Sequence, residues 1–346
     1  MVIRWISTSN QASVWAESET AMPTLKSPAR VTVLVAAIAA AVAVTGLAPS
    51  AQAPADEVIR TADINVRGLM RSDFPRMQRL ADNVYVYSGL QQRTDIEMEF
   101  TTNNLVVVTR DGVLVADGQI NEGDTRQLLA AIARVTPLPV RYVVVGSDHN
   151  DHVGGNTVFP TGTTFISHPA SKAVIEERNR TAAVKLPVPQ ETVSDRKVLT
   201  FGGMEIHVQF LGRAHTGGDL SVYLPRENIL FMSEAYFNRL FPSLYGGYPS
   251  EWVATLHKAE AMNAAIYVPG HGFIDSPRIL KEELVNFRQS VEKIVAEGYR
   301  LHRAGVPLTR APRSAILGPF GYWTRAAQNL PEALGRVYAE ASGELK

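Results

Sequence analysis

Apolar residues recur between residues 84 and 342 with two different spacings. Short runs rich in Val and Ile predict strands, and two of them, 104–109 and 112–116, flank Asp111-Gly112, which is typical of a hairpin turn. The other expected strands are 84–88, 141–145, 163–167, 198–200, 204–211, 220–224, 229–232 and 265–268. Apolar positions three and four residues apart predict helices at 122–135, 170–179, 252–262, 277–304 and 331–342.

The order of these elements predicts two halves, each a series of strands followed by helices. Such halves indicate two sheets packed face to face with helices outside. The expected fold is therefore of the α/β class, a four-layer αββα sandwich at residues 81–305. An irregular lead-in at 56–80 precedes it, and a C-terminal helical extension at 306–346 is expected to pack on the same domain.

The first 55 residues have a different pattern. Lys26 and Arg30 precede an apolar run at 31–47, and the small residues Ala51 and Ala53 follow. A positive flank, an apolar run and an A-x-A site are typical of a secretory signal peptide. The alternative is a transmembrane anchor, for which the run is short. We therefore expect a periplasmic or secreted protein without a stable membrane anchor after cleavage.

Charge and cysteine content narrow the classes of function. Lys and Arg total 34, as do Asp and Glu, so the formal net charge is zero. A balanced charge gives no indication of a nucleic-acid partner, which favours basic proteins. Because the chain has no cysteine, any metal must be bound by His, Asp or Glu.

Three glycine-containing turns carry histidine, and each follows an expected strand. They are Ser147-Asp-His-Asn-Asp-His152, Gly212-Arg-Ala-His-Thr-Gly-Gly-Asp219 and Val268-Pro-Gly-His-Gly272. A single turn of this kind can be a solvated loop, but three together favour a metal site of His and Asp ligands. The candidate ligands are His149, Asp151, His152, His215 and His271. The histidines outside these turns, interpreted as structural or surface residues, are His168, His207, His257 and His302.

This combination resembles the metallo-β-lactamase fold superfamily over residues 80–300. The family signature is His-x-His-x-Asp-His, then Gly-x-x-His-Thr-x-Gly-Asp, an Asp at a strand end and a Pro-Gly-His turn. The resemblance implies a first zinc bound by His149 and His215. It implies a second zinc bound by Asp151, His152 and His271. Glu234 stands at the position of the bridging acidic ligand.

Two positions depart from that signature. Ser147 replaces the first His, and Glu234 replaces the usual Asp. Serine is a poor zinc ligand, so we expect one zinc or two unequal ones, with Glu234 reaching across to compensate. Asp148 could also compensate, but an extended turn should point it away from His149. Iron and manganese remain open, because mixed His and carboxylate sites do not select one metal.

The resemblance and the ligand set lead to an expected chemistry. Zinc lowers the pKa of bound water from 15.7 to about 7 and polarises carbonyl groups. The leading hypothesis is a zinc-dependent hydrolase whose metal-bound hydroxide attacks a small molecule: a lactone, ester, amide or lactam. The expected catalytic carboxylates are Asp151 and Glu234. The alternatives are a class B-like β-lactamase and a non-hydrolytic metal-binding or oxidoreductase accessory protein.

Further residues are expected around the ligands. Ser147 is one, and Asp219 either supports a ligating His or closes its own turn. The aromatic stretch 236–249 contains Tyr245 and Tyr248, of which we expect one to contact substrate. The alternative for these tyrosines is packing of a long loop on the core.

Overall fold

The computed structural model describes residues 57–93 and 98–345. The expected signal peptide at 1–55 lies outside this part of the chain. None of the helices in the described ranges is long and apolar enough to cross a membrane.

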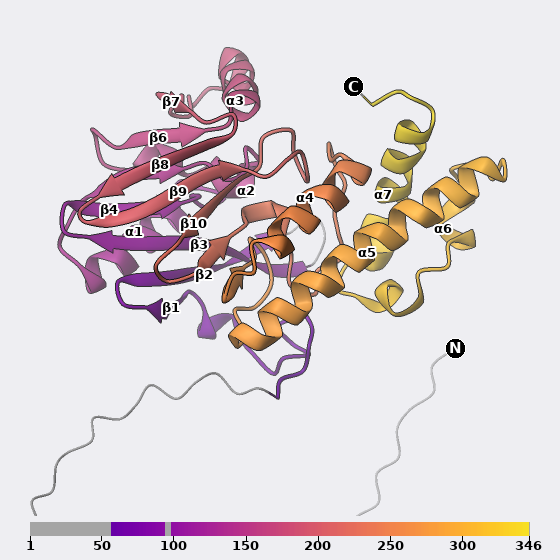
Figure 1. The fold of residues 1–346 in the computed structure, drawn as a ribbon, viewed down its shortest axis with the longest axis horizontal. Coiled ribbons are helices and arrows are strands. Elements are labelled where there is room, and N and C mark those ends of the chain that lie inside the picture. The colour runs from indigo at the N-terminus through magenta and orange to yellow at the C-terminus, as the bar shows by residue number, and fades with distance from the viewer. Residues whose placement is uncertain (1–56, 94–97, 346) are drawn as a thin grey trace, which may run out of the picture. The chain divides into compact units, whose positions relative to one another are not determined.

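The described residues form two sheets (Figure 1). The first sheet contains, in spatial order, β1 (Arg76–Ala81), β2 (Val84–Arg93), β3 (Met98–Thr109), β4 (Gly112–Ala116), β5 (Val140–Val144), β6 (Thr164–Ser167) and β7 (Glu191–Thr192). The second contains β12 (Ile266–Val268), β11 (Ile229–Phe231), β10 (Leu220–Leu224), β9 (Met204–Phe210) and β8 (Arg196–Phe201). Neighbours from β4 to β7 are parallel, as are β11 and β12, whereas the other pairs are antiparallel.

A core of aliphatic side chains lies between the two sheets. Leu114 and Ala116 of β4 pack there with Val222 of β10 and Phe231 of β11. Alternate residues of β4 face the other way and join a second core with helix α1. Because β4 is buried on both faces, it appears in the sequence as an unbroken apolar run.

Helices cover the outer face of each sheet and complete the expected four layers. Side chains of α1 (Glu122–Val135) and α3 (Pro169–Thr181) pack on the first sheet. The second sheet is covered by α4 (Pro249–Ala261) and α5 (Pro277–Arg303), and α7 (Ala326–Ala341) packs against these two helices. Short turns complete the chain: η1 (Arg71–Asp73), α2 (Asn150–Val153), η2 (Asn156–Val158), η3 (Ser233–Ala235), α6 (Ala311–Ser314) and η4 (Gly318–Tyr322). The αββα prediction is confirmed.

The structure corrects three predicted boundaries. The expected irregular lead-in ends early, because residues 76–81 form the edge strand β1, whose polar sequence lacks an apolar alternation. Strands β2 and β3 extend beyond the predicted ranges 84–88 and 104–109, and the polar residues at 101–104 of β3 are buried. Helix α7 begins at Ala326 rather than at 331, and Pro331 lies inside it.

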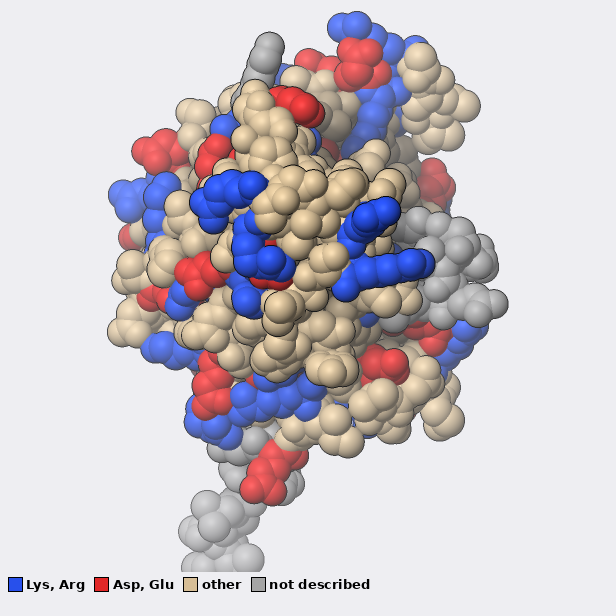
Figure 2. Space-filling view, turned by 90° about the vertical axis from the view of Figure 1, so that its right-hand side faces the viewer, with Lys and Arg blue, Asp and Glu red and all other residues tan. Residues whose placement is uncertain are grey.

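The C-terminal helices pack on the domain that carries the sheets. Val337 of α7 approaches α5 so closely that a Cβ atom on Gly298 would lie 2.5 Å from its Cγ1 atom. Figure 2 shows the side formed by these helices, where basic, acidic and uncharged side chains are interspersed. This face therefore has mixed charge, in keeping with the balanced composition.

Candidate metal centre

The candidate ligands come from the ends of four strands. His149, Asp151 and His152 follow β5, and His215 follows β9. Glu234 lies in the turn η3 directly after β11, and the turn after β12 carries His271. Strand ends that meet at one edge bring these side chains together although the sequence separates them by up to 122 residues (271 − 149).

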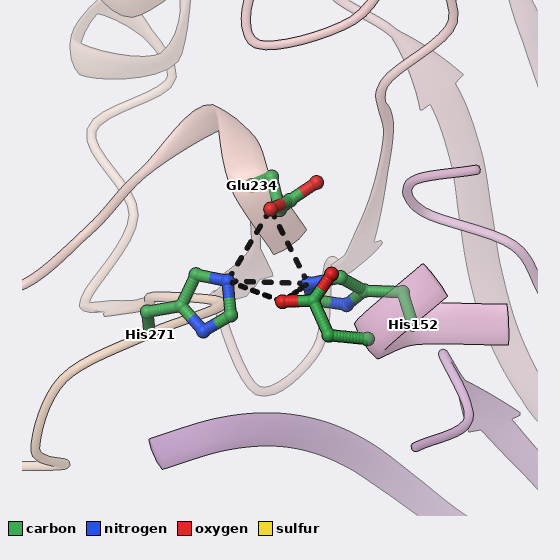
Figure 3. A group of neighbouring side chains, drawn as sticks. His152, Glu234 and His271 are labelled. Atoms are coloured by element: carbon green, nitrogen blue, oxygen red, sulfur yellow. Dashed lines mark hydrogen bonds and ion pairs between the residues drawn. The ribbon is translucent and has the colours of Figure 1, made fainter. Parts of the chain in front are cut away.

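Asp151, His152, Glu234 and His271 form one group, and Figure 3 shows the labelled side chains pointing at one another. The Nε2 atoms of His152 and His271 are 3.3 Å apart. His271 Nε2 lies 3.4 Å from Asp151 Oδ2 and 3.3 Å from Glu234 Oε1. Two nitrogen ligands 2.0–2.1 Å from one tetrahedral zinc would be about 3.3 Å apart. The spacing of these donors therefore fits a single ion.

His149, His215 and Glu234 form the neighbouring group. His149 Nδ1 lies 2.9 Å from His215 Nε2 and 3.0 Å from Glu234 Oε2. Glu234 Oε1 lies 3.1 Å from His215 Nε2. Glu234 thus belongs to both groups, and its two oxygens face different histidines.

Hydrogen bonds orient three of the imidazole rings through the nitrogen that faces away from the cluster. The Nδ1 atom of His215 donates to the carbonyl of Ser243 at 2.7 Å, and that of His271 to Thr101 at 2.8 Å. His152 Nδ1 donates to Asp117 Oδ2 at 2.9 Å. Acceptors at Nδ1 favour the tautomer whose Nε2 lone pair is free, which is the form that binds a metal. The donor set and its support therefore fit zinc.

The buried carboxylates of the site favour positive charge on the neighbouring imidazole rings. Burial alone would raise the pKa of Glu234, but His215, His149 and His152 hold it well below its usual range. Burial would lower the pKa of His149, but the Glu234 carboxylate outweighs it and raises that pKa to about 9. For His152 burial is outweighed by Asp117 and Glu234, which raise the pKa to about 10. These carboxylates stabilise cations among the rings, so protons and a metal ion would compete for the same nitrogens.

Asp117, at the end of β4, was not singled out from the sequence. It is fully buried and has a left-handed backbone, with φ of 65°. Its Oδ2 accepts hydrogen bonds from His152 and, at 2.6 Å, from Ser233, while its Oδ1 accepts one from the Gly146 amide at 2.7 Å. The only sequence signal was its place at the end of a strand, because its partners lie 29 to 116 residues away.

Asp117→Asn is expected to weaken metal binding at the His152 group by roughly 10- to 100-fold, the usual effect of losing an outer partner of a ligating histidine. The amide NH2 would face two donors, so His152 would turn or change tautomer. Metal titration of the metal-free protein measures this. Asp195→Asn, an exposed position, is the control, and equal affinities in both variants would contradict the assigned role.

Two consecutive asparagines on β3 also support the site and were missed. Asn103 donates to the carbonyls of Pro269 and Gly272, on either side of His271. Asn104 points to the other face of the strand and donates to the carbonyls of Asp117 and Gly118. Strand β3 therefore contacts the loop of His271 through Asn103 on one face and the loop of Asp117 through Asn104 on the other.

The other residues expected around the ligands have distinct places. Ser147 donates a hydrogen bond to Glu234 Oε2. Asp148 points away, as expected, with its Oδ1 3.5 Å from the Arg178 guanidinium. Asp219 accepts from the amide and hydroxyl of Thr216, so it closes its own turn, and burial raises its pKa to about 6.

A cavity of about 500 Å³ opens in front of the two ligand groups. Tyr245 lines it, is largely exposed, and has its ring 6.4 Å from that of His149. Tyr248 is not among the lining residues, because its ring packs under the Arg213 guanidinium at 3.9 Å. Of the two expected tyrosines, only Tyr245 therefore lines the cavity.

The histidines outside the motifs form hydrogen bonds or ion pairs apart from the two ligand groups. His168 caps α3 by accepting from the Ala170 amide. His207 pairs with Glu205, His257 with Glu292, and His302 with the Ser342 hydroxyl.

Comparison with known proteins matches residues 98–271 to the model of the metallo-beta-lactamase superfamily. The chain belongs to this superfamily. Family membership and the two ligand groups together support a metal-dependent hydrolase at the level of the superfamily. The matched region ends at His271, so α5, α6 and α7 lie beyond it.

Relatives of this superfamily member are distant. It is 25% identical over 223 residues to metallo-beta-lactamase type 2 of Bacteroides fragilis, covering 62% of this chain and 87% of the relative. It is also 25% identical over 166 residues to a 2,4-dinitroanisole O-demethylase subunit alpha of Nocardioides sp. (strain JS1661), covering 46% and 49%. A solved metallo-beta-lactamase from Pontibacter korlensis has a TM-score of 0.55 at 20% identity and covers 62% and 99%. The structural likeness supports the fold alone.

Proposed function

We propose that this protein is a zinc-dependent hydrolase of small molecules with a carbonyl-centred bond, namely a lactone, ester, amide or lactam. The observation that carries the proposal is the pair of ligand groups sharing Glu234 at the base of the cavity. Bound zinc would lower the pKa of a coordinated water to about 7 and polarise the carbonyl.

The chain's own residues have separable roles in this proposal. His149 and His215 would hold one ion, and Asp151, His152 and His271 the other, with Glu234 between them. The Asp151 side chain keeps 19% of its surface accessible and lines the cavity, so it can also orient water and accept a proton. The apolar side chains of Phe100, Phe237 and Leu240 line the same cavity and would limit the entry of further water.

A class B-like β-lactamase is the second candidate, because the curated relatives include metallo-beta-lactamases. Ser147 and Glu234 weigh against it, since both depart from the signature of the family. A non-hydrolytic role remains the third hypothesis, and it predicts an iron-containing protein without turnover.

Metal content per chain, measured after purification without added metal, is the first test. Zinc in the protein, followed by turnover in a screen of lactones, esters, amides and β-lactams, would support the proposal. The screen should include 2,4-dinitroanisole, an ether without a carbonyl, because of the relative named for its demethylation. Zinc-loaded protein inactive on all the carbonyl compounds would overturn the proposal, even if it cleaved the ether.

Ser147 is expected to make the two ions unequal. The His149 group offers two imidazoles and a shared carboxylate, whereas the Asp151 group offers one more ligand. A chelator should therefore remove the ion beside His149 first, and Ser147→His should tighten that ion by supplying a third imidazole. Metal titration of wild type, Ser147→His and the exposed control Ser314→His measures the difference. Two equally tight ions in the wild type, unaffected by the substitution, would contradict this.

We also propose export to the periplasm or medium, from the signal-like pattern around Lys26, Arg30 and 31–47. Sequencing the N-terminus of the mature protein tests it. The expected start is near Pro54 or Asp56, and an intact N-terminus in the cytoplasm would show that the segment is not a cleaved signal.

A further inference from the structure

One face of helix α7 contacts the loop that leads from η3 to α4. Glu332, Arg336 and Glu340 are spaced by four residues, so their side chains lie on the same face of the helix. Each of them forms a hydrogen bond with the segment 243–250. This face begins 61 residues beyond the end of the family match at 271 (332 − 271). A helix outside the matched region therefore contacts a loop of the matched domain.

Arg336 makes the central contact of this face, and the contact is with the main chain. Its Nε atom donates to the carbonyl of Gly247 at 2.6 Å, and its Nη2 atom donates to the carbonyl of Gly246 at 3.1 Å. Its guanidinium carbon also lies 5.6 Å from the centre of the Tyr248 ring. Hydrogen bonds from a guanidinium are stronger than those between neutral groups, and its planar fork fixes their direction. Arg336 therefore holds the backbone of the loop in one position relative to α7.

The same loop orients a candidate metal ligand. The Nδ1 atom of His215 donates to the carbonyl of Ser243 at 2.7 Å, which favours the tautomer whose Nε2 lone pair is free for a metal. Directly after Ser243 the chain makes a turn, closed by the Gly247 amide donating to the Leu244 carbonyl at 2.9 Å. Gly246 has a positive φ of 77° in this turn, which glycine adopts readily. One closed turn thus connects the Ser243 carbonyl to the two carbonyls that accept from the guanidinium.

Other hydrogen bonds anchor the loop on either side of the turn. The Phe241 amide donates to the Thr324 carbonyl before it, and the Tyr248 amide donates to the Ala214 carbonyl after it, both at 2.9 Å. Arg336 acts between these two anchors, on the turn itself. Removing its donors should therefore leave the ends of the loop in place and allow the turn to shift.

We propose that Arg336 is a positioning residue of the metal centre. By holding the turn, it keeps the Ser243 carbonyl on His215 Nδ1. It thereby sets the affinity of the group formed by His149, His215 and Glu234 for its ion. The inference rests on the proposed function, which supplies zinc as that ion, and it makes α7 part of the support of the site.

Arg336→Met removes both donors and keeps the length of the side chain. The zinc beside His149 should bind roughly 5- to 10-fold less tightly, the effect of an ordinary hydrogen bond, whereas the ion of the Asp151 group should bind as in the wild type. Because Leu244 of the turn is buried in the core, the variant should remain folded. Competition with a chelator of known affinity measures both ions, and Arg313→Met, at an exposed position of α6, is the matched control. Unchanged affinity for the ion beside His149 in Arg336→Met would overturn the proposal.

Two further variants separate positioning from a loss of stability. Glu340, on the same face of α7, accepts from the amide and the hydroxyl of Ser250 at 3.2 and 3.0 Å, at the start of α4. Glu340→Ala should therefore lower Tm without weakening either ion. Arg336→Lys keeps a cationic donor without the planar fork and should bind the ion beside His149 with intermediate affinity. If Glu340→Ala weakens that ion as much as Arg336→Met does, α7 acts only through stability and the proposal fails.

The Nδ1 proton of His215 gives a readout that does not need turnover. NMR of isotope-labelled, zinc-loaded protein should show this proton exchanging with water at least about 5-fold faster in Arg336→Met than in the wild type. The Nδ1 proton of His271, which is donated to the Thr101 carbonyl, is the internal control. If the wild type hydrolyses none of the carbonyl compounds but shows this difference, the hydrolase proposal fails and the role of Arg336 stands. Unchanged exchange at His215 would overturn that role whatever the activity.

Discussion

His271→Ala is expected to remove the ion from the Asp151 group and to lower hydrolysis more than the roughly 10- to 100-fold typical of losing an outer partner. His271 Nε2 stands 3.3 to 3.4 Å from the other donors, so its loss opens one vertex of the proposed tetrahedron. Besides this donor, the substitution removes the hydrogen bond that His271 Nδ1 donates to the Thr101 carbonyl. Metal content after dialysis and initial rates measure the effect.

The control for this variant is His257→Ala. His257 is an exposed residue of α4 whose Nε2 pairs with Glu292, outside the cavity. Circular dichroism and Tm should show that both variants remain folded. Full metal content and full activity in His271→Ala would mean that the ligand set is wrong.

Glu234→Ala is expected to release the ion beside His149 and His215 while the Asp151 group retains a weakened one. Without Glu234 the first group has two imidazoles, whereas the second keeps Asp151, His152 and His271. Two protein ligands rarely hold zinc, and three are enough for a catalytic site. Metal per chain should therefore fall to about one or below, with turnover reduced because the two groups no longer share a carboxylate.

The metal-free form of this variant gives an independent readout. Burial favours neutral His149, and the Glu234 carboxylate is what raises its pKa to about 9. Removing that carboxylate should bring the pKa down, so the ring should lose its proton at lower pH in an NMR titration. Glu205→Ala, whose carboxylate pairs with His207 on β9, is the matched control and should leave His149 unchanged. An unchanged His149 titration in Glu234→Ala would place its charge partner elsewhere.

Local sequence patterns were enough to predict most of the helices and strands. The helix at 122–135 and the strand at 220–224 have the predicted bounds, because each has a regular apolar period and clear ends. The start of α7 was missed by five residues, since a proline is commonest in the first turn of a helix and Pro331 instead lies in the interior. Tertiary contacts of Asn329 and Ala326 hold the turns before it.

The candidate ligands were found from the sequence because each histidine turn follows an apolar strand within a few residues. The groups that orient those ligands were not. Asp117, Asn103 and Asn104 are polar residues in or next to strands, and nothing in their immediate neighbours distinguishes them. Their partners are main-chain and side-chain atoms far away in the sequence, so only the folded chain identifies their role.

The sequence by itself determined the αββα layers and the types of ligand, because periodicity and short motifs are local properties of the chain. Only the tertiary structure decided that Glu234 faces both ligand groups and that Asp117 orients His152. The physical reason is distance along the chain. Hydrogen bonds and cavity walls join residues that the packing of sheets and helices brings together, and no local pattern records which ones they are.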